Sequence, residues 1–117
     1  MRRIIGAVAL AGLLMAGTGA AGAHPEPAGT FGCRMAATKL GSHIEVTFRV
    51  RSSDPGHAWR VRLWDGAARF ADRTRTADAE GRLRVVASTR NRGGRDDIVG
   101  VGRDLITGGR CRVELSI

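Results

Sequence analysis

The stretch that decides the fold is His57-Ala58-Trp59-Arg60-Val61-Arg62-Leu63-Trp64-Asp65, where apolar residues alternate with arginines. A period of two is typical of a β-strand that buries one face. Trp59, Val61 and Leu63 are therefore predicted to point into a core, whereas Arg60 and Arg62 are predicted to face solvent. An Asp-Gly turn signal closes the run. We expect Trp59 to be the central side chain of the core.

The same alternation recurs along the chain, with turn residues between the runs. A strand at 68–76 has few apolar residues and is predicted to lie at a sheet edge, where its arginines would discourage pairing with another chain. For the strand at 98–101, the sequence does not decide which residues point inward, because glycines at 100 and 102 are compatible with either face. Seven strands are predicted. The first is short, begins at Phe31 and ends before a turn at 39–42, and the others are at 44–50, 57–65, 68–76, 83–88, 98–101 and 111–117.

The N-terminus has the three parts of a secretory signal peptide, namely two arginines, an apolar run at 4–16 and small residues that end at Ala23. The apolar run is shorter than the roughly 20 residues that span a bilayer. We therefore expect cleavage of a signal peptide at 1–23, a secreted, extracellular product and no membrane span after cleavage. Residues 24–30 would form an extended arm, and residues 31–117 a single β-sandwich domain.

The sequence has two cysteines, Cys33 and Cys111, near the two ends of the predicted domain. In a protein routed to an oxidising compartment they are predicted to form a disulfide bond. Closing so long a loop stabilises a fold by about 4 to 5 kcal/mol in the chain-entropy model. The bond requires the first and last strands to approach within about 6 Å at these positions.

Seven short strands around one core tryptophan predict an all-β fold, a seven-stranded immunoglobulin-like or fibronectin-like β-sandwich. In such an arrangement the second and fifth strands share one sheet, and the third and seventh share the other. Two segments carry a family resemblance, Thr-Ala-Asp-Ala-Glu-Gly at 76–81 and Cys-Arg-Val-Glu-Leu-Ser at 111–116. They resemble small secreted immunoglobulin-like proteins of high-GC Gram-positive bacteria. They are more weakly similar to the neocarzinostatin family of chromophore-carrying apoproteins, which has two disulfides where this chain can form one.

Motifs of known catalytic centres are missing from the sequence, which has no H-E-x-x-H, no G-x-S-x-G and no phosphate-binding glycine loop. We therefore expect no enzyme activity. Asp96 and Asp97 are interpreted as turn formers rather than calcium ligands. The predicted function is a secreted non-catalytic binding or structural module that acts at or outside the cell envelope on a protein or an anionic polymer. The alternative is a small-ligand or copper carrier that uses His24 or a cleft of the sandwich.

Arginines dominate the charge of the chain, which is formally +8. Many of them occupy outward positions of the predicted strands, and both outer faces of the sandwich are expected to carry several. The possible polyanion surface comprises Arg49, Arg60, Arg62, Arg82, Arg84 and Arg112. These arginines either solvate the surface or bind an anionic polymer, in which case affinity would fall steeply with salt. Nucleic acid is not expected as a partner, because no aromatic residue is predicted among these arginines.

Copper binding at the processed N-terminus is a testable expectation. Cleavage after Ala23 would expose the imidazole and free amine of His24 as a chelating pair, with His43 or His57 as a further ligand. Cu(II) should bind tightly to protein whose intact mass shows that it begins at His24. One residue added before His24 should abolish this binding, because the amine of His24 then becomes part of a peptide bond. Equal affinity with and without the added residue would contradict a copper carrier.

Overall fold

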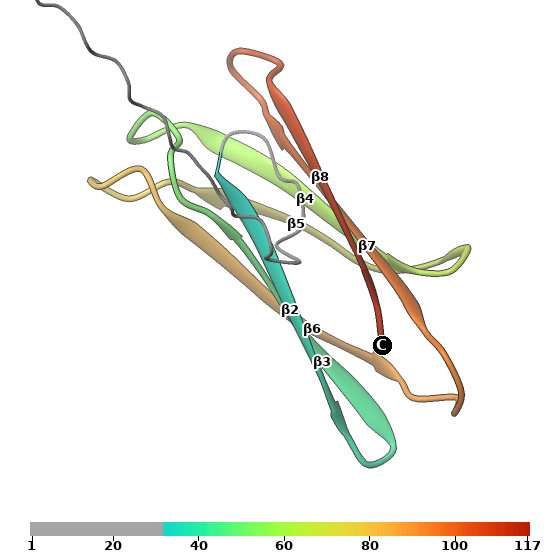
Figure 1. Cartoon of the computed structure of the whole chain (residues 1–117). Coiled ribbons are helices and arrows are strands. Elements are labelled where there is room, and N and C mark those ends of the chain that lie inside the picture. Colours follow the sequence, from blue (N-terminus) through green and yellow to red (C-terminus); the bar gives the residue numbers. More distant parts are fainter. Residues whose placement is uncertain (1–31) are drawn as a thin grey trace, which may run out of the picture.

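The computed structural model describes residues 32–117, which form two packed antiparallel sheets (Figure 1). The strands are β2 (Cys33–Leu40), β3 (His43–Val50), β4 (Ala58–Asp65), β5 (Ala68–Thr76), β6 (Leu83–Arg90), β7 (Asp97–Asp104) and β8 (Arg110–Ser116). One sheet has the order β2-β3-β6 and the other the order β5-β4-β7-β8. The predicted all-β sandwich of seven strands is therefore confirmed. The predicted signal peptide, the arm with His24, and Phe31 lie outside the described residues.

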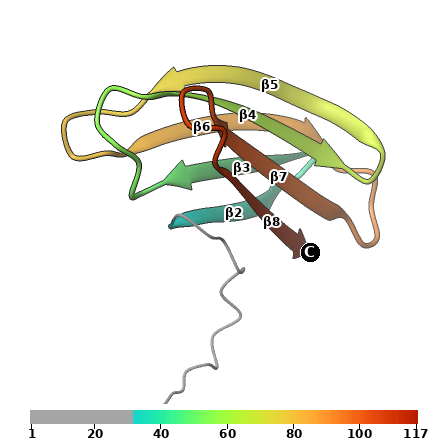
Figure 2. The same ribbon diagram turned by 90° about the horizontal axis from the view of Figure 1, so that it is seen from above.

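The two sheets meet along both of their sides (Figure 2). On one side β2 packs against β8, and on the other β5 packs against β6. β5 lies at the edge of its sheet, as predicted, beside β4 and connected to it by the two-residue turn Gly66-Ala67. The second and fifth strands of the sandwich, β3 and β6, share one sheet, and the third and seventh, β4 and β8, share the other.

β4 buries the face that its sequence predicts. Trp59, Val61 and Leu63 are at most 1% exposed, whereas Arg60 and Arg62 lie on the outer face. The indole nitrogen of Trp59 would be costly to bury without a partner. It donates a hydrogen bond to the hydroxyl of Ser53, at 2.8 Å. Trp59 is thus both the largest fully buried side chain and a link from the core to the loop before β4.

The phase of β7, which its glycines left open, places Ile98, Gly100 and Gly102 inward. The reason is the ring of Phe48, which comes from β3 in the opposite sheet. A Cβ atom at Gly100 would lie 2.7 Å from Cδ2 of Phe48 and 2.9 Å from Sδ of Met35. The glycines therefore form a slot that a side chain of any size would fill, and the Phe48 ring occupies it.

The first strand is longer than predicted. We expected a turn over 39–42, but Lys39 pairs with Ile44 and Leu40 with His43, so the turn contains only Gly41 and Ser42. Gly41 adopts a positive φ of 68°, which is what two-residue hairpin turns require. The last part of β2 is exposed, so no inward apolar residue marks it in the sequence.

The disulfide between Cys33 and Cys111 is present and joins β2 to β8. The two Cα atoms are 6.3 Å apart and the residues are 78 positions apart in the sequence. β2 and β8 are edge strands of different sheets, so the bond closes one side of the sandwich covalently. This placement confirms that the first and last strands approach each other.

The glycine slot can be tested by Gly100→Ala. The added carbon would overlap the Phe48 ring, and overpacking of this kind costs about 1 to 3 kcal/mol of unfolding free energy. Denaturant melts of the variant, of Phe48→Leu and of the double variant measure the effect. Because the smaller side chain makes room for the new methyl group, the double variant should be more stable than the sum of the two changes predicts. Strict additivity would contradict a contact between the two positions.

Candidate functional site

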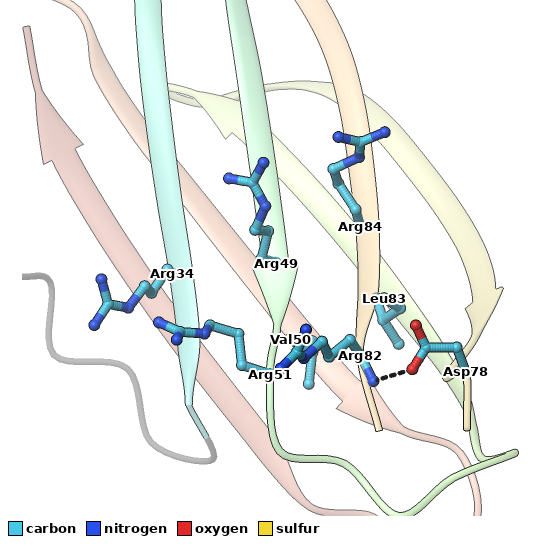
Figure 3. A pocket seen from close by; sticks show the side chains of 8 residues that line it. All are labelled: Arg34, Arg49, Val50, Arg51, Asp78, Arg82, Leu83 and Arg84. Carbon is cyan, nitrogen blue, oxygen red and sulfur yellow. Dashed lines mark hydrogen bonds between the residues drawn. The ribbon is translucent and has the colours of Figure 1, made fainter. Parts of the chain in front are cut away.

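Five arginines gather near one end of the outer face of the three-stranded sheet (Figure 3). Arg34 on β2 is directly opposite Arg49 on β3, and Arg49 is directly opposite Arg84 on β6. Arg51 follows β3, and Arg82 precedes β6, so these two extend the group toward the loops. We call these five residues the arginine cluster. They line an open pocket of about 530 Å³ together with Val50, Asp78 and Leu83.

The alternation of the strands produces the arginine cluster. Val50 and Leu83 are buried and oppose each other in the register, so the arginines on both sides of each emerge on the outer face. Neighbouring strands are only about 4.8 Å apart. Like charges directly opposite each other destabilise a strand pair. Arg34, Arg49 and Arg84 form a row of such like charges across three strands.

One carboxylate lies at this pocket. Among the residues that line the pocket, Asp78 is the single acidic one. Its Oδ1 accepts hydrogen bonds from the backbone amides of Glu80 and Arg82, both at 2.9 Å. These bonds shape the turn before β6. The pocket thus presents a concentrated positive charge to any ligand.

As expected, the predicted polyanion residues are divided between the two outer faces. Arg49, Arg82 and Arg84 belong to the arginine cluster, and Arg34 and Arg51, which the predicted set did not contain, complete it. The other three of the set, Arg60, Arg62 and Arg112, lie on the outer face of the four-stranded sheet.

Two arginines of this other face are held by carboxylates. Arg60 donates to both carboxylate oxygens of Asp72, at 2.9 and 2.7 Å, and this hydrogen bonding lowers the pKa of Asp72. Arg112 forms an ion pair of 2.7 Å with Glu114. Their charges are therefore partly neutralised.

The expectation that no aromatic residue lies among the arginines was wrong. Trp64 occupies the outward phase of β4, is only partly buried, and pairs with Arg69 on β5 and Val99 on β7. It lines an open groove of about 450 Å³. The signal was present in the sequence, because Trp64 follows Arg60 and Arg62 on the same phase. The other residues that line the groove are Arg62, Gly66, Ala67, Val99, Val101, Arg110 and Arg112.

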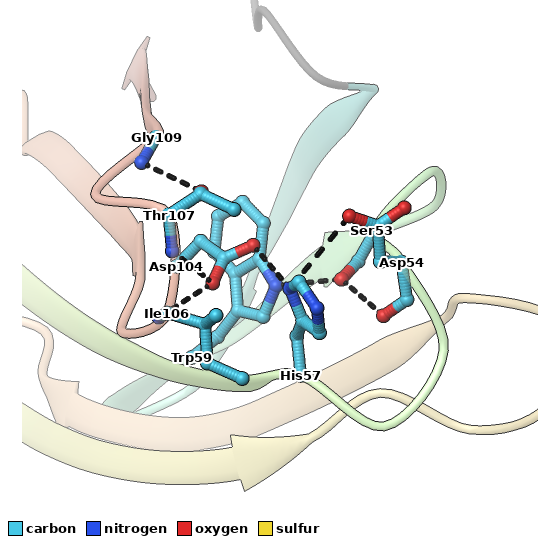
Figure 4. Close-up of polar contacts among 8 residues, drawn as sticks. All are labelled: Ser53, Asp54, His57, Trp59, Asp104, Ile106, Thr107 and Gly109. Carbon is cyan, nitrogen blue, oxygen red and sulfur yellow. Dashed lines mark hydrogen bonds and ion pairs between the residues drawn. The ribbon is translucent and has the colours of Figure 1, made fainter.

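His57 takes part in a network that links two loops (Figure 4). Its Nδ1 lies 2.9 Å from Oδ2 of the buried Asp104, whose other oxygen accepts from the amides of Ile106 and Thr107. Burial alone would raise the pKa of Asp104, but these hydrogen bonds outweigh it, so that the pKa is lowered. The nearby hydroxyl of Ser53 donates to the carbonyl oxygen of Asp54, so it is engaged in the loop.

The two histidines proposed as further copper ligands lie at opposite ends of the sandwich. His43 begins β3 beside the β2–β3 turn and is exposed, whereas His57 precedes β4 and contacts Asp104. Among residues 32–117, no group of three or more His, Cys, Asp or Glu side chains could hold a metal ion. His24 lies outside this range.

Asp65 and Asp96 are buried acids at the end of the sandwich away from the arginine cluster. Within the described residues, Oδ2 of each accepts no hydrogen bond. Arg92 lies 3.6 Å from Asp65, and Lys39 lies 3.7 Å from Asp96. Burial raises the pKa of Asp65, and the charge of Asp96 raises it further. Asp97, in contrast, is exposed and accepts from the hydroxyl of Ser116, at 2.6 Å.

No known protein family matches the chain, and no similar protein was found among curated proteins or solved structures. What is shown is a two-sheet sandwich of three and four strands with one disulfide. In the described part of the chain, no helix has the length and apolar character needed to cross a membrane.

The buried acid pair predicts a pH-dependent effect of Asp65→Asn. A carboxyl whose pKa is raised by folding stabilises the fold at low pH, and this contribution is lost as the pH rises through the folded pKa. The variant should therefore be more stable than the parent at pH 7, with the gain shrinking toward pH 3.5. Denaturant melts at both pH values measure this, with the exposed Glu45→Gln as control. An equal gain at both pH values would show that the charge of Asp65 is not its cause.

Proposed function

We propose that the protein is a secreted, non-catalytic binding module that holds an anionic polymer of the cell envelope on the arginine cluster. The observation that carries this proposal is the row of Arg34, Arg49 and Arg84 in direct register across three strands. A bound anion would offset repulsion between like charges that lie directly opposite each other. Guanidinium groups also bind phosphate and carboxylate groups through two parallel hydrogen bonds.

The spacing of the cluster supports a polymer with repeated charges. In extended backbone, positions two apart, such as Arg49 and Arg51 or Arg82 and Arg84, are separated by about 6.6 Å. Adjacent strands add a second row at about 4.8 Å. The resulting grid is larger than one carboxylate or phosphate group, and its pocket is open rather than enclosed. A chain with successive anionic groups could engage several arginines at once and release its counterions.

The filled core favours a binding module rather than a carrier that holds a ligand in an internal cleft. Phe48, Trp59 and Met35 are buried, and the Phe48 ring fills the slot between the two sheets. The two pockets described above lie on outer faces, where an extended ligand has access. Secretion remains part of the proposal, and the disulfide is consistent with an oxidising compartment.

The test is retention on purified anionic cell-wall polymer at about 50 and 200 mM salt. Five arginine contacts predict a loss of affinity of about a hundredfold across this range. The double variant Arg49→Ser, Arg84→Ser should bind more weakly and show a smaller salt dependence, because two contacts are removed. The control is Arg73→Ser with Arg75→Ser, which removes the same charge from the exposed edge strand β5.

Two outcomes would overturn this proposal. The first is the absence of retention at the lower salt concentration. The second is an equal loss in the β5 control, which would mean that net charge rather than the arginine cluster governs binding.

A further inference from the structure

The hairpin between β7 and β8 ends in two adjacent exposed aliphatic residues. Leu105 is 49% exposed and Ile106 is 65% exposed. The other large hydrophobic side chains that are exposed within residues 32–117 are Leu40, near the β2–β3 turn, and Val86, on the outer face of β6. Single exposed aliphatic residues are common on protein surfaces. Two neighbours at the tip of a hairpin form a small apolar projection, which we call the apolar tip.

Hydrogen bonds hold the apolar tip in a defined shape (Figure 4). Oδ1 of Asp104 accepts from the amides of Ile106 and Thr107, at 2.8 and 3.2 Å. The backbone amide of Gly108 donates to the carbonyl of Asp104, and the amide of Leu105 donates to the carbonyl of Ala58 on β4. Because the loop is already ordered, it would lose little conformational entropy when it binds to another surface.

Two exposed arginines lie at the base of this hairpin. Arg103 and Arg110 face each other across β7 and β8, and both are exposed. Arg60 on β4 lies beside Arg103, but its charge is partly neutralised by Asp72. The acid closest in sequence, Asp104, is buried and directed toward His57. An apolar projection therefore stands on a cationic base.

We propose that the apolar tip inserts into the interfacial region of an anionic lipid bilayer, with Arg103 and Arg110 among the headgroups. This goes beyond polymer binding and uses different residues. Aliphatic side chains gain free energy when they leave water. Basic residues near the surface are attracted to anionic lipids.

A bilayer fits the apolar tip better than a protein partner does. A stable protein interface needs about 1,000 Å² or more of complementary surface. Two side chains on a convex hairpin offer far less, whereas lipid headgroups and chains adapt to a projection of any shape.

The experiment is cosedimentation of the full domain with vesicles of phosphatidylglycerol or of phosphatidylcholine. We expect binding to the former, and Leu105→Ser or Ile106→Ser should lower the partition coefficient by about tenfold. Leu40→Ser is a matched control, because Leu40 is 45% exposed and lies at the other end of the sandwich. Arg103→Gln should weaken binding more than Arg95→Gln, which removes a charge from the loop before β7.

Insertion itself can be observed with Ile106→Trp. The emission that this tryptophan adds should shift to the blue on phosphatidylglycerol vesicles and should be quenched by brominated lipid chains. Equal vesicle binding by the Leu40 and Leu105 variants would overturn the proposal. So would unquenched emission at position 106, or an apolar tip that instead mediates a dimer in sedimentation analysis. Arg49→Ser with Arg84→Ser tests the polymer site separately, since it leaves the apolar tip intact.

Discussion

The contact between the Phe48 ring and the glycines of β7 sets the distance between the two sheets. Phe48 is fully buried and projects from the three-stranded sheet into the four-stranded one, where Gly100 and Gly102 leave room for it. A Cβ atom at Gly100 would overlap the ring, and one at Gly102 would lie 3.2 Å from it, so that the neighbouring side chains would have to shift slightly. Trp59 then packs beside Gly102, with its Cε3 atom 3.3 Å from a Cβ placed there, so the two largest buried side chains share this close approach.

The strands could be predicted because burial on one face leaves a period of two in the sequence. β3, β4 and β6 carry this pattern clearly, and the inward residues of β4 were assigned correctly from it. The end of β2 carries no such pattern, because Lys39 and Leu40 are exposed and pair with β3 through the backbone. The phase of β7 depends on a ring from another sheet. No property of the glycines themselves reveals that contact.

The candidate site was partly predictable for a related reason. Alternation places each arginine on an outer face, and this holds for Arg49, Arg60 and Arg84 alike. Which arginines become neighbours depends on how strands are divided between the sheets and on their register, as the pairing of Arg34 with Arg49 illustrates. Neutralising partners are a further tertiary property, because Asp72 on β5 reaches Arg60 on the neighbouring strand β4.

The position of the disulfide has a mechanical consequence. Cys33 lies at the start of the first described strand, and Cys111 lies early in the last one. A pulling force applied to the segments outside these two residues would pass directly through the covalent bond. The strands between them would carry no load, and only the short segment after Cys111 could be peeled from its neighbour. In the oxidised state the sandwich therefore behaves as a nearly inextensible link, whereas reduction would turn the same chain into one that can be drawn out strand by strand.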